Sequence, residues 1–217
     1  MTDPLRQKIA AALQRAPAPT RRQVRLRNAL ILGAGLAGSL GLFLALGGFR
    51  GGGAPRPVAL IVGTFGGTLA LAVATWRAAW WRQGTMLGPP RDALVGVTLA
   101  VPLLYLAWKI GLSQTVDGAA DWWPTRVGFR CFGMSNLVSA PILAALLATR
   151  RGASPVQPGW AGAALGVAAG ATAALGVDLW CPVGHPAHVL MGHALPIALL
   201  GALGAASGSR WLRRPAR

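Results

Sequence analysis

Apolar residues form six long runs along the chain, and short stretches rich in arginine, glycine and proline separate them. An α-helix needs about 20 mainly apolar residues to cross the hydrocarbon core of a bilayer. The runs reach that length at about 29–48, 58–80, 93–111, 129–149, 159–180 and 188–208. The pattern therefore predicts an all-α membrane protein, with a bundle of six transmembrane helices over residues 29–210. A tail of residues 1–28 precedes the bundle, and a basic tail of residues 211–217 follows it.

Composition and charge indicate the same class of protein. The chain has 217 residues, of which 53% are hydrophobic and 12% are charged, and its formal net charge is +16. Such basic charge is typical of nucleic-acid-binding proteins and of the cytoplasmic loops of membrane proteins. Here the arginines lie in short clusters between uncharged runs, and no predicted helix carries a basic stripe. This distribution predicts a protein in contact with membrane lipid and argues against direct binding of nucleic acid.

The basic residues also predict the direction in which the helices cross the membrane. Lysine and arginine near the ends of spans are enriched on the cytoplasmic side. The N-terminal tail is strongly basic, with Arg6, Lys8, Arg15, Arg21, Arg22, Arg25 and Arg27. If this tail lies inside, the basic loops after the second and fourth spans and the basic C-terminal end lie inside too. An even number of spans then puts both termini in the cytoplasm.

Small residues recur at intervals of four in three of the predicted spans. They are Gly63 and Gly67 in the second span, Gly162, Gly166, Gly170 and Ala174 in the fifth, and Gly204 and Gly208 in the sixth. A face of small residues lets two helix backbones approach closely in lipid, where no hydrophobic effect drives helices together. The spacing therefore predicts tight helix packing along these faces.

Ionisable residues are absent from the centres of the predicted spans. Lys109 and Asp178 are expected near the outer ends of their spans, where we predict that both side chains reach the interface. Ion-coupled transporters normally keep ionisable groups at mid-membrane. The chain also lacks paired carboxylates, a glycine-rich phosphate loop and a serine beside a base. We therefore expect neither an enzyme nor a protein with a small-molecule substrate.

The two cysteines are distant in sequence but are predicted at the same membrane depth. Cys131 lies at the outer end of the fourth span, and Cys181 directly follows the outer end of the fifth. Outside a bacterial cytoplasm, thiols face an oxidising compartment. Three interpretations stay open: a pair that never bonds, a permanent disulfide, and a pair that responds to oxidants or metals.

The stretch that begins at Cys181 also contains every histidine of the chain. Zinc and copper are bound by thiolate and imidazole, so the residue types suit a metal site. The candidate ligands are Cys131, Cys181, His185, His188 and His193, and the candidate ion is zinc or another thiophilic metal. Their spacing matches no standard zinc pattern, so histidines that bind no metal at the interface remain the alternative.

The N-terminal tail begins with the signals of a short amphipathic helix. Asp3 suits the N-cap, and a proline follows at the first helical position. An apolar stripe is formed by Leu5, Ile9 and Leu13. A helix of this length is marginal alone in water. It is expected to lie on the membrane surface, to stay disordered, or to dock into a partner's groove.

The second half of the chain carries a recognisable order of features. In "CFGMSNLVSAPILAALLATRRGASPVQPGWAGAALGVAAGATAALGVDLWCP", a cysteine precedes a span with a proline, a basic "RRGA" turn follows, and a glycine-rich span ends at a second "CP". Together with the stripe in the tail, this order resembles the negative regulator of sigma F family of six-span bacterial membrane anti-sigma factors.

This resemblance implies a protein of the bacterial inner membrane that holds an extracytoplasmic-function sigma factor and releases it under oxidative or metal stress. Cys131 and Cys181 match the family's sensing positions. Leu5, Ile9 and Leu13 are the candidate residues for binding the sigma factor. The alternative is a small membrane transporter or metal-ion permease that uses the cysteine and histidine cluster as an outer capture site.

Overall fold

A computed structural model describes residues 7, 20–48, 57–80, 89–115, 128–151 and 155–212. Its helices are α2 (Arg21–Ala45), α3 (Val58–Trp80), α4 (Arg91–Thr115), α5 (Phe129–Thr149), α6 (Pro158–Trp180), α7 (Pro186–Val189), the π-helical turn η1 (Leu190–Ala194) and α8 (Leu195–Trp211). The segment Pro186–Trp211 is one continuous span, so six helices are long and apolar enough to cross a membrane. The prediction of an all-helical chain with six such helices is confirmed for the described residues.

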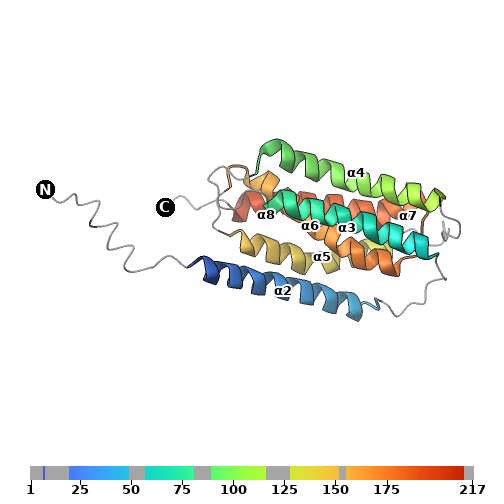
Figure 1. The fold of residues 1–217 in the computed structure, drawn as a ribbon, viewed down its shortest axis with the longest axis horizontal. Helices are drawn as coiled ribbons and strands as arrows, with labels where there is room; N and C mark the ends of the chain where they lie inside the picture. The colour runs from blue at the N-terminus through green and yellow to red at the C-terminus, as the bar shows by residue number, and fades with distance from the viewer. Residues whose placement is uncertain are drawn as a thin grey trace.

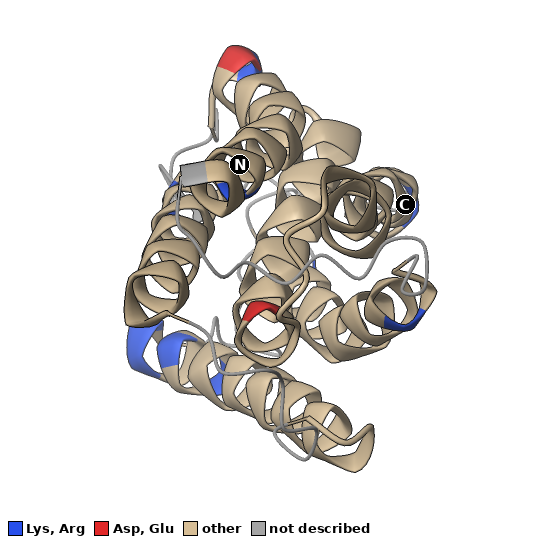
Figure 2. Ribbon diagram, turned by 90° about the vertical axis from the view of Figure 1, so that its right-hand side faces the viewer, with Lys and Arg blue, Asp and Glu red and all other residues tan. Residues whose placement is uncertain are grey.

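The helices lie side by side along the long axis of the molecule (Figure 1). Helix α2 begins and α8 ends at the same end of the bundle, and α7 lies at the opposite end (Figure 1). Seen down the bundle in Figure 2, nearly all of the ribbon is free of lysine, arginine and acidic residues. This arrangement matches a multi-pass membrane protein, in which long uncharged helices face lipid.

Helix α2 begins earlier than the sequence analysis expects. Thr20 and Gln23 form a capping box, in which the Thr20 hydroxyl accepts from the Gln23 amide and the Gln23 side chain accepts from the Thr20 amide. This T-x-x-Q signal makes residues 21–28 the first turns of the first span. The expected apolar stripe of Leu5, Ile9 and Leu13 lies outside the described residues.

The centre of the bundle is the contact between α6 and α8. A Cβ atom at Gly162 would overlap the backbone of Gly204, and one at Gly166 would overlap the backbone carbonyl of Leu200. The two helices therefore touch backbone to backbone, and side chains larger than hydrogen do not fit between them at these positions. The predicted packing role of the glycine faces in the fifth and sixth spans is confirmed.

Helix α2 lies at the edge of the bundle, next to α5 (Figure 1). Its buried residues are Gly35, Ser39 and Phe43, which are four apart and form one narrow stripe. At Gly35 the contact with α5 is close, because a Cβ atom there would overlap the Ala145 side chain. Helix α2 is thus attached to the bundle along a single line.

Candidate functional site

The two cysteines meet at the end of the bundle where α7 lies. Cys131 is in the first turn of α5, and Cys181 caps the C-terminal end of α6, where its amide donates to the Val177 carbonyl. The Cys131 thiol donates to the Cys181 sulfur across 3.5 Å. Both residues are buried, and no disulfide joins their sulfurs. The sulfur atoms of two residues that are fifty positions apart in the sequence therefore lie at about van der Waals distance.

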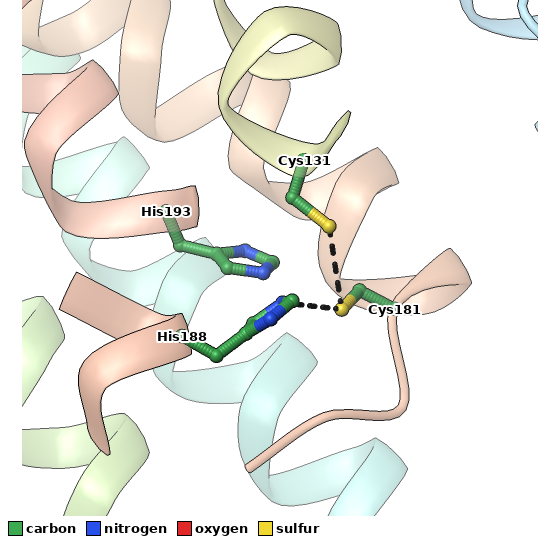
Figure 3. A group of neighbouring side chains, drawn as sticks. All are labelled: Cys131, Cys181, His188 and His193. Atoms are coloured by element: carbon green, nitrogen blue, oxygen red, sulfur yellow. Dashed lines mark hydrogen bonds between the residues drawn. The ribbon is translucent and has the colours of Figure 1, made fainter. Parts of the chain in front are cut away.

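Two histidines complete the cluster. The His188 Nε2 atom lies 3.2 Å from the Cys181 sulfur, and the rings of His188 and His193 have their centroids 5.5 Å apart. Both imidazoles are almost fully buried. One ligand atom from each of Cys131, Cys181, His188 and His193 can be chosen so that all four lie within 4.8 Å of one another (Figure 3). We call these four residues the thiol–imidazole cluster.

The π-helical turn explains why two histidines five residues apart face the same way. In an α-helix, side chains at i and i+5 point about 140° apart, whereas a π-helical turn with its i→i+5 hydrogen bonds holds more residues per turn and makes this angle smaller. The Leu195 amide donates to the Leu190 carbonyl, which is the i→i+5 bond of such a turn. The turn brings His193 round to the side of the helix that carries His188.

Pro196 and Ser135 fit this π-helical turn. Pro196 has no amide hydrogen, so it cannot donate to the Gly192 carbonyl as an α-helical residue would. The Ser135 hydroxyl of α5 donates to that carbonyl instead, across 3.3 Å. This is an interhelical hydrogen bond, the role expected for a polar residue in a span.

Two glycines allow α5 to approach η1 at the level of Cys131. Gly128 precedes α5 with a φ of 100°, a backbone conformation that glycine adopts without strain. A Cβ atom at Gly192 would lie 3.0 Å from the Cys131 Cβ atom and 3.2 Å from the Gly128 carbonyl oxygen. Without these glycines, Cys131 would stand further from the histidines.

Asp178 links the thiol–imidazole cluster to the neighbouring helices through its carboxylate. Its carboxylate accepts from the Tyr105 hydroxyl at 2.7 Å and from the Thr68 hydroxyl at 2.9 Å, and it forms an ion pair with Lys109. The His193 Nδ1 atom lies 3.1 Å from the same carboxylate. Asp178 therefore joins α3, α4, α6 and η1 through one buried acid.

The expectation that Lys109 and Asp178 reach the membrane interface is wrong. Lys109 is 5% exposed and Asp178 is 2% exposed. The two side chains satisfy each other's charge inside the bundle, which removes the need for either to reach water. Spacing along single helices gave no sign of this pair, since the partners lie on α4 and α6. The polar residues Thr68 and Tyr105 were missed for the same reason.

His185 is not part of the thiol–imidazole cluster, although it belongs to the candidate metal ligands of the sequence analysis. It caps the N-terminal end of α7, where its Nδ1 atom accepts from the Ala187 amide at 3.2 Å. The proline at position 186 is the sequence signal for this role, because proline favours the first position of a helix. Among the described residues, the cluster holds the other four candidates.

The comparisons with known proteins agree with the resemblance found in the sequence. A model of the family described as negative regulator of sigma F matches residues 12–213. The chain belongs to this family. No curated protein and no solved structure gives a significant match. Membership in the negative regulator of sigma F family implies negative regulation of a sigma factor.

In this member of the negative regulator of sigma F family, the thiol–imidazole cluster supports two kinds of chemistry. Two adjacent thiols can be oxidised, and two thiolates with two imidazoles can bind a thiophilic metal. The hydrogen bond from Cys131 holds the pKa of the Cys181 thiol well below its usual range. A thiolate is the form that reacts with oxidants and with metals, and this hydrogen bond stabilises the thiolate of Cys181.

Proposed function

We propose that this chain is an anti-sigma factor of the bacterial inner membrane that binds an extracytoplasmic-function sigma factor and releases it on oxidative or metal stress. The family match over residues 12–213 supports the regulatory half of this proposal. The pairing of Cys131 and Cys181 at one end of the bundle supports the sensing half. The sensing end and the sigma-binding end would be opposite ends of one six-helix bundle.

The distribution of arginine supports a cytoplasmic position for the end where α2 begins. By their places in the helices, the described arginines of this end are Arg21, Arg22, Arg25, Arg27, Arg77, Arg91, Arg150, Arg151 and Arg210. Among the described basic residues, Lys109 and Arg130 lie toward the other end. Because lysine and arginine are enriched on the cytoplasmic side of spans, the thiol–imidazole cluster is assigned to the outer side.

Helix α2 offers a physical connection between the two ends. Phe43, near its C-terminal end, packs in one buried group with Cys131, Cys181, Met134 and Val138. The other end of α2 follows directly from the N-terminal segment that carries the expected sigma-binding stripe. A change in volume or bonding at the cysteines would displace Phe43 and, with it, the helix that leads to this segment.

Binding to a sigma factor is tested with the full-length chain in detergent. We expect it to co-purify with one extracytoplasmic-function sigma factor of the same genome. Replacing the stripe by aspartates (L5D, I9D, L13D) should reduce recovery of that sigma factor at least tenfold. The matched control replaces Gln7, Ala11 and Gln14 by aspartate, which places the same three charges on the opposite side of the expected helix. Absence of any sigma factor from the wild-type preparation would refute the anti-sigma function.

The sensing step is tested separately with a reporter promoter that depends on the sigma factor. Cys131→Ser and Cys181→Ser should each abolish induction by oxidants and by thiophilic metals, because each removes half of the pair. Ser113→Ala is a suitable control, since Ser113 binds the Gly184 carbonyl near the cluster without contacting either sulfur. Wild-type induction in both cysteine variants would overturn the sensing proposal and leave the anti-sigma function standing.

A further inference from the structure

We infer that Cys131, Cys181, His188 and His193 form a tetrahedral site for one divalent ion of the zinc type, and that Asp178 is a positioning residue that orients His193 in this site. The inference names the signal read by the sensing step, and its use in the cell rests on the proposed function. The binding itself does not, because it involves only residues of this chain.

The spacing of the ligand atoms fits a tetrahedral ion. Zn–S bonds of about 2.3 Å and Zn–N bonds of about 2.0–2.1 Å give tetrahedron edges of roughly 3.4–3.8 Å. The observed sulfur–sulfur distance is 3.5 Å, the distance from the Cys181 sulfur to His188 Nε2 is 3.2 Å, and all four ligand atoms lie within 4.8 Å. Adjustments of about 1 Å would complete the four-ligand geometry.

His193 provides an independent sign that a ligand belongs in the cluster. The residue is 1% exposed, and neither of its ring nitrogens has a hydrogen bond of good geometry within the described structure. A buried nitrogen without a partner costs free energy, so such atoms are rare in native proteins. Because Nδ1 lies 3.1 Å from the Asp178 carboxylate, Nε2 is the nitrogen that an ion would satisfy.

Asp178 fits the role of a positioning residue for His193. Its Oδ1 atom lies 3.1 Å from His193 Nδ1, so a small rotation of the ring gives the carboxylate–histidine–metal arrangement found in zinc proteins. In that arrangement Nδ1 keeps its hydrogen and Nε2 is free to bind the ion. The hydrogen bonds from Tyr105 and Thr68 hold the carboxylate in place for this purpose.

Charge balance favours a divalent ion over a monovalent one. Two thiolates carry two negative charges, which a divalent ion cancels, and the buried Asp178 is already neutralised by Lys109. A monovalent ion with the same four ligands would leave one negative charge uncompensated inside the bundle. Because an unpaired charge is costly to bury, the cluster matches zinc, cobalt or cadmium in their divalent forms.

Binding requires the loss of one proton from each thiol. Two metal–sulfur bonds form, two S–H bonds break, and two protons pass to water on the outer side, with no change in oxidation state. A small pocket beside the cluster, lined in part by Lys109, Asp178 and Cys181, has room for about one water molecule. The bound ion would tie α5, the end of α6, α7 and η1 together.

The experiment is a titration of the purified, reduced full-length protein in detergent with Co²⁺, followed by competition with Zn²⁺. We expect one Co²⁺ per chain, visible absorption bands typical of tetrahedral cobalt, and a sulfur-to-cobalt band in the ultraviolet that Zn²⁺ abolishes. His188→Ala and His193→Ala should each lose the tetrahedral spectrum. His185→Ala is the matched control and should bind like the wild type, because His185 caps α7 and is not one of the four cluster residues.

Two further variants address folding and the role of Asp178. His193→Cys should keep one tetrahedral Co²⁺ and strengthen the sulfur band, a result that a misfolded protein would not give. Asp178→Asn should weaken Co²⁺ binding about 10- to 100-fold, and Asp178→Glu should restore part of the affinity.

The site is overturned if the reduced wild type takes up no Co²⁺, or if the alanine variants of His188 and His193 bind it unchanged. Equal affinity for wild type and Asp178→Asn would remove the positioning role. None of these measurements involves a sigma factor, so they fail or succeed independently of the proposed function.

Discussion

Helices α6 and α2 represent two extremes of burial in this bundle. In α6 every residue from Gly162 to Ala171 is buried, and small side chains let α8 approach to backbone contact. In α2 the buried residues are Gly35, Ser39 and Phe43, and large apolar side chains such as Leu30 and Leu40 are exposed. In a bilayer these exposed side chains face lipid, whereas α6 faces other helices on nearly all sides.

The difference indicates which part of the molecule is fixed and which part can move. The thiol–imidazole cluster is attached to the buried part, since Cys181 caps α6 and Asp178 lies in its last turn. Helix α2 contacts that region through Phe43. Regions with few buried contacts open at lower free energy than a packed core. Under the proposed function, a signal that starts at the cysteines would therefore have α2 as its least restrained neighbour.

The largest effect is expected from Asp178→Asn in α6. This substitution leaves Lys109 buried without its counter-charge, and breaking a buried ion pair in this way costs about 3–5 kcal/mol. We expect the free energy of unfolding in detergent to fall by that amount, measured by SDS titration with helical circular dichroism. Asp92→Asn is the control, because Asp92 is exposed in the first turn of α4. Similar stability for the two variants would mean that the buried pair does not hold α6 in place.

A smaller effect is expected from adding one methyl group to α6. Gly166→Ala places a Cβ atom onto the Leu200 carbonyl, and overpacking of this kind costs about 1–3 kcal/mol. Gly33→Ala in α2 meets nothing within 4 Å, so it should raise stability by about 0.5–1 kcal/mol through the lower chain entropy of alanine. The same unfolding assay measures both variants. A loss of stability in Gly166→Ala together with a gain in Gly33→Ala would support the contrast between the two helices. Equal losses of stability in both variants would contradict it.

A small effect on global stability, confined to one helix, is expected from Phe43→Leu. The smaller side chain loosens α2 from the cysteine region at a cost of about 1 kcal/mol. Amide hydrogen exchange should become faster in α2 and stay unchanged in α6, because the opening is local. Leu42→Ala, at a residue that is 39% exposed, should change neither rate measurably. Uniformly faster exchange in both helices would show that α2 is part of the core after all.

Much of the fold could be predicted from local features of the sequence. Six apolar runs of bilayer length predict six helices, because unpaired backbone groups are too costly in lipid for any open structure. Glycines four apart predict the face of α6 that α8 covers, since spacing of four keeps residues on one side of a helix. The T-x-x-Q sequence at Thr20 signals the true start of α2, although the apolar run begins later.

The site depended on features that no single helix contains. His185 is a candidate ligand by sequence because it lies in the same stretch as the other histidines. In the structure it caps α7 and lies outside the cluster, whereas the π-helical turn brings His193 into it. Lys109 and Asp178 looked like two interfacial residues until their helices were placed side by side. The number of helices and the faces of small residues follow from local patterns in the sequence. Which polar side chains share one interior depends on the neighbours and rotation of each helix, and in an apolar bundle many rotations satisfy the same hydrophobic pattern.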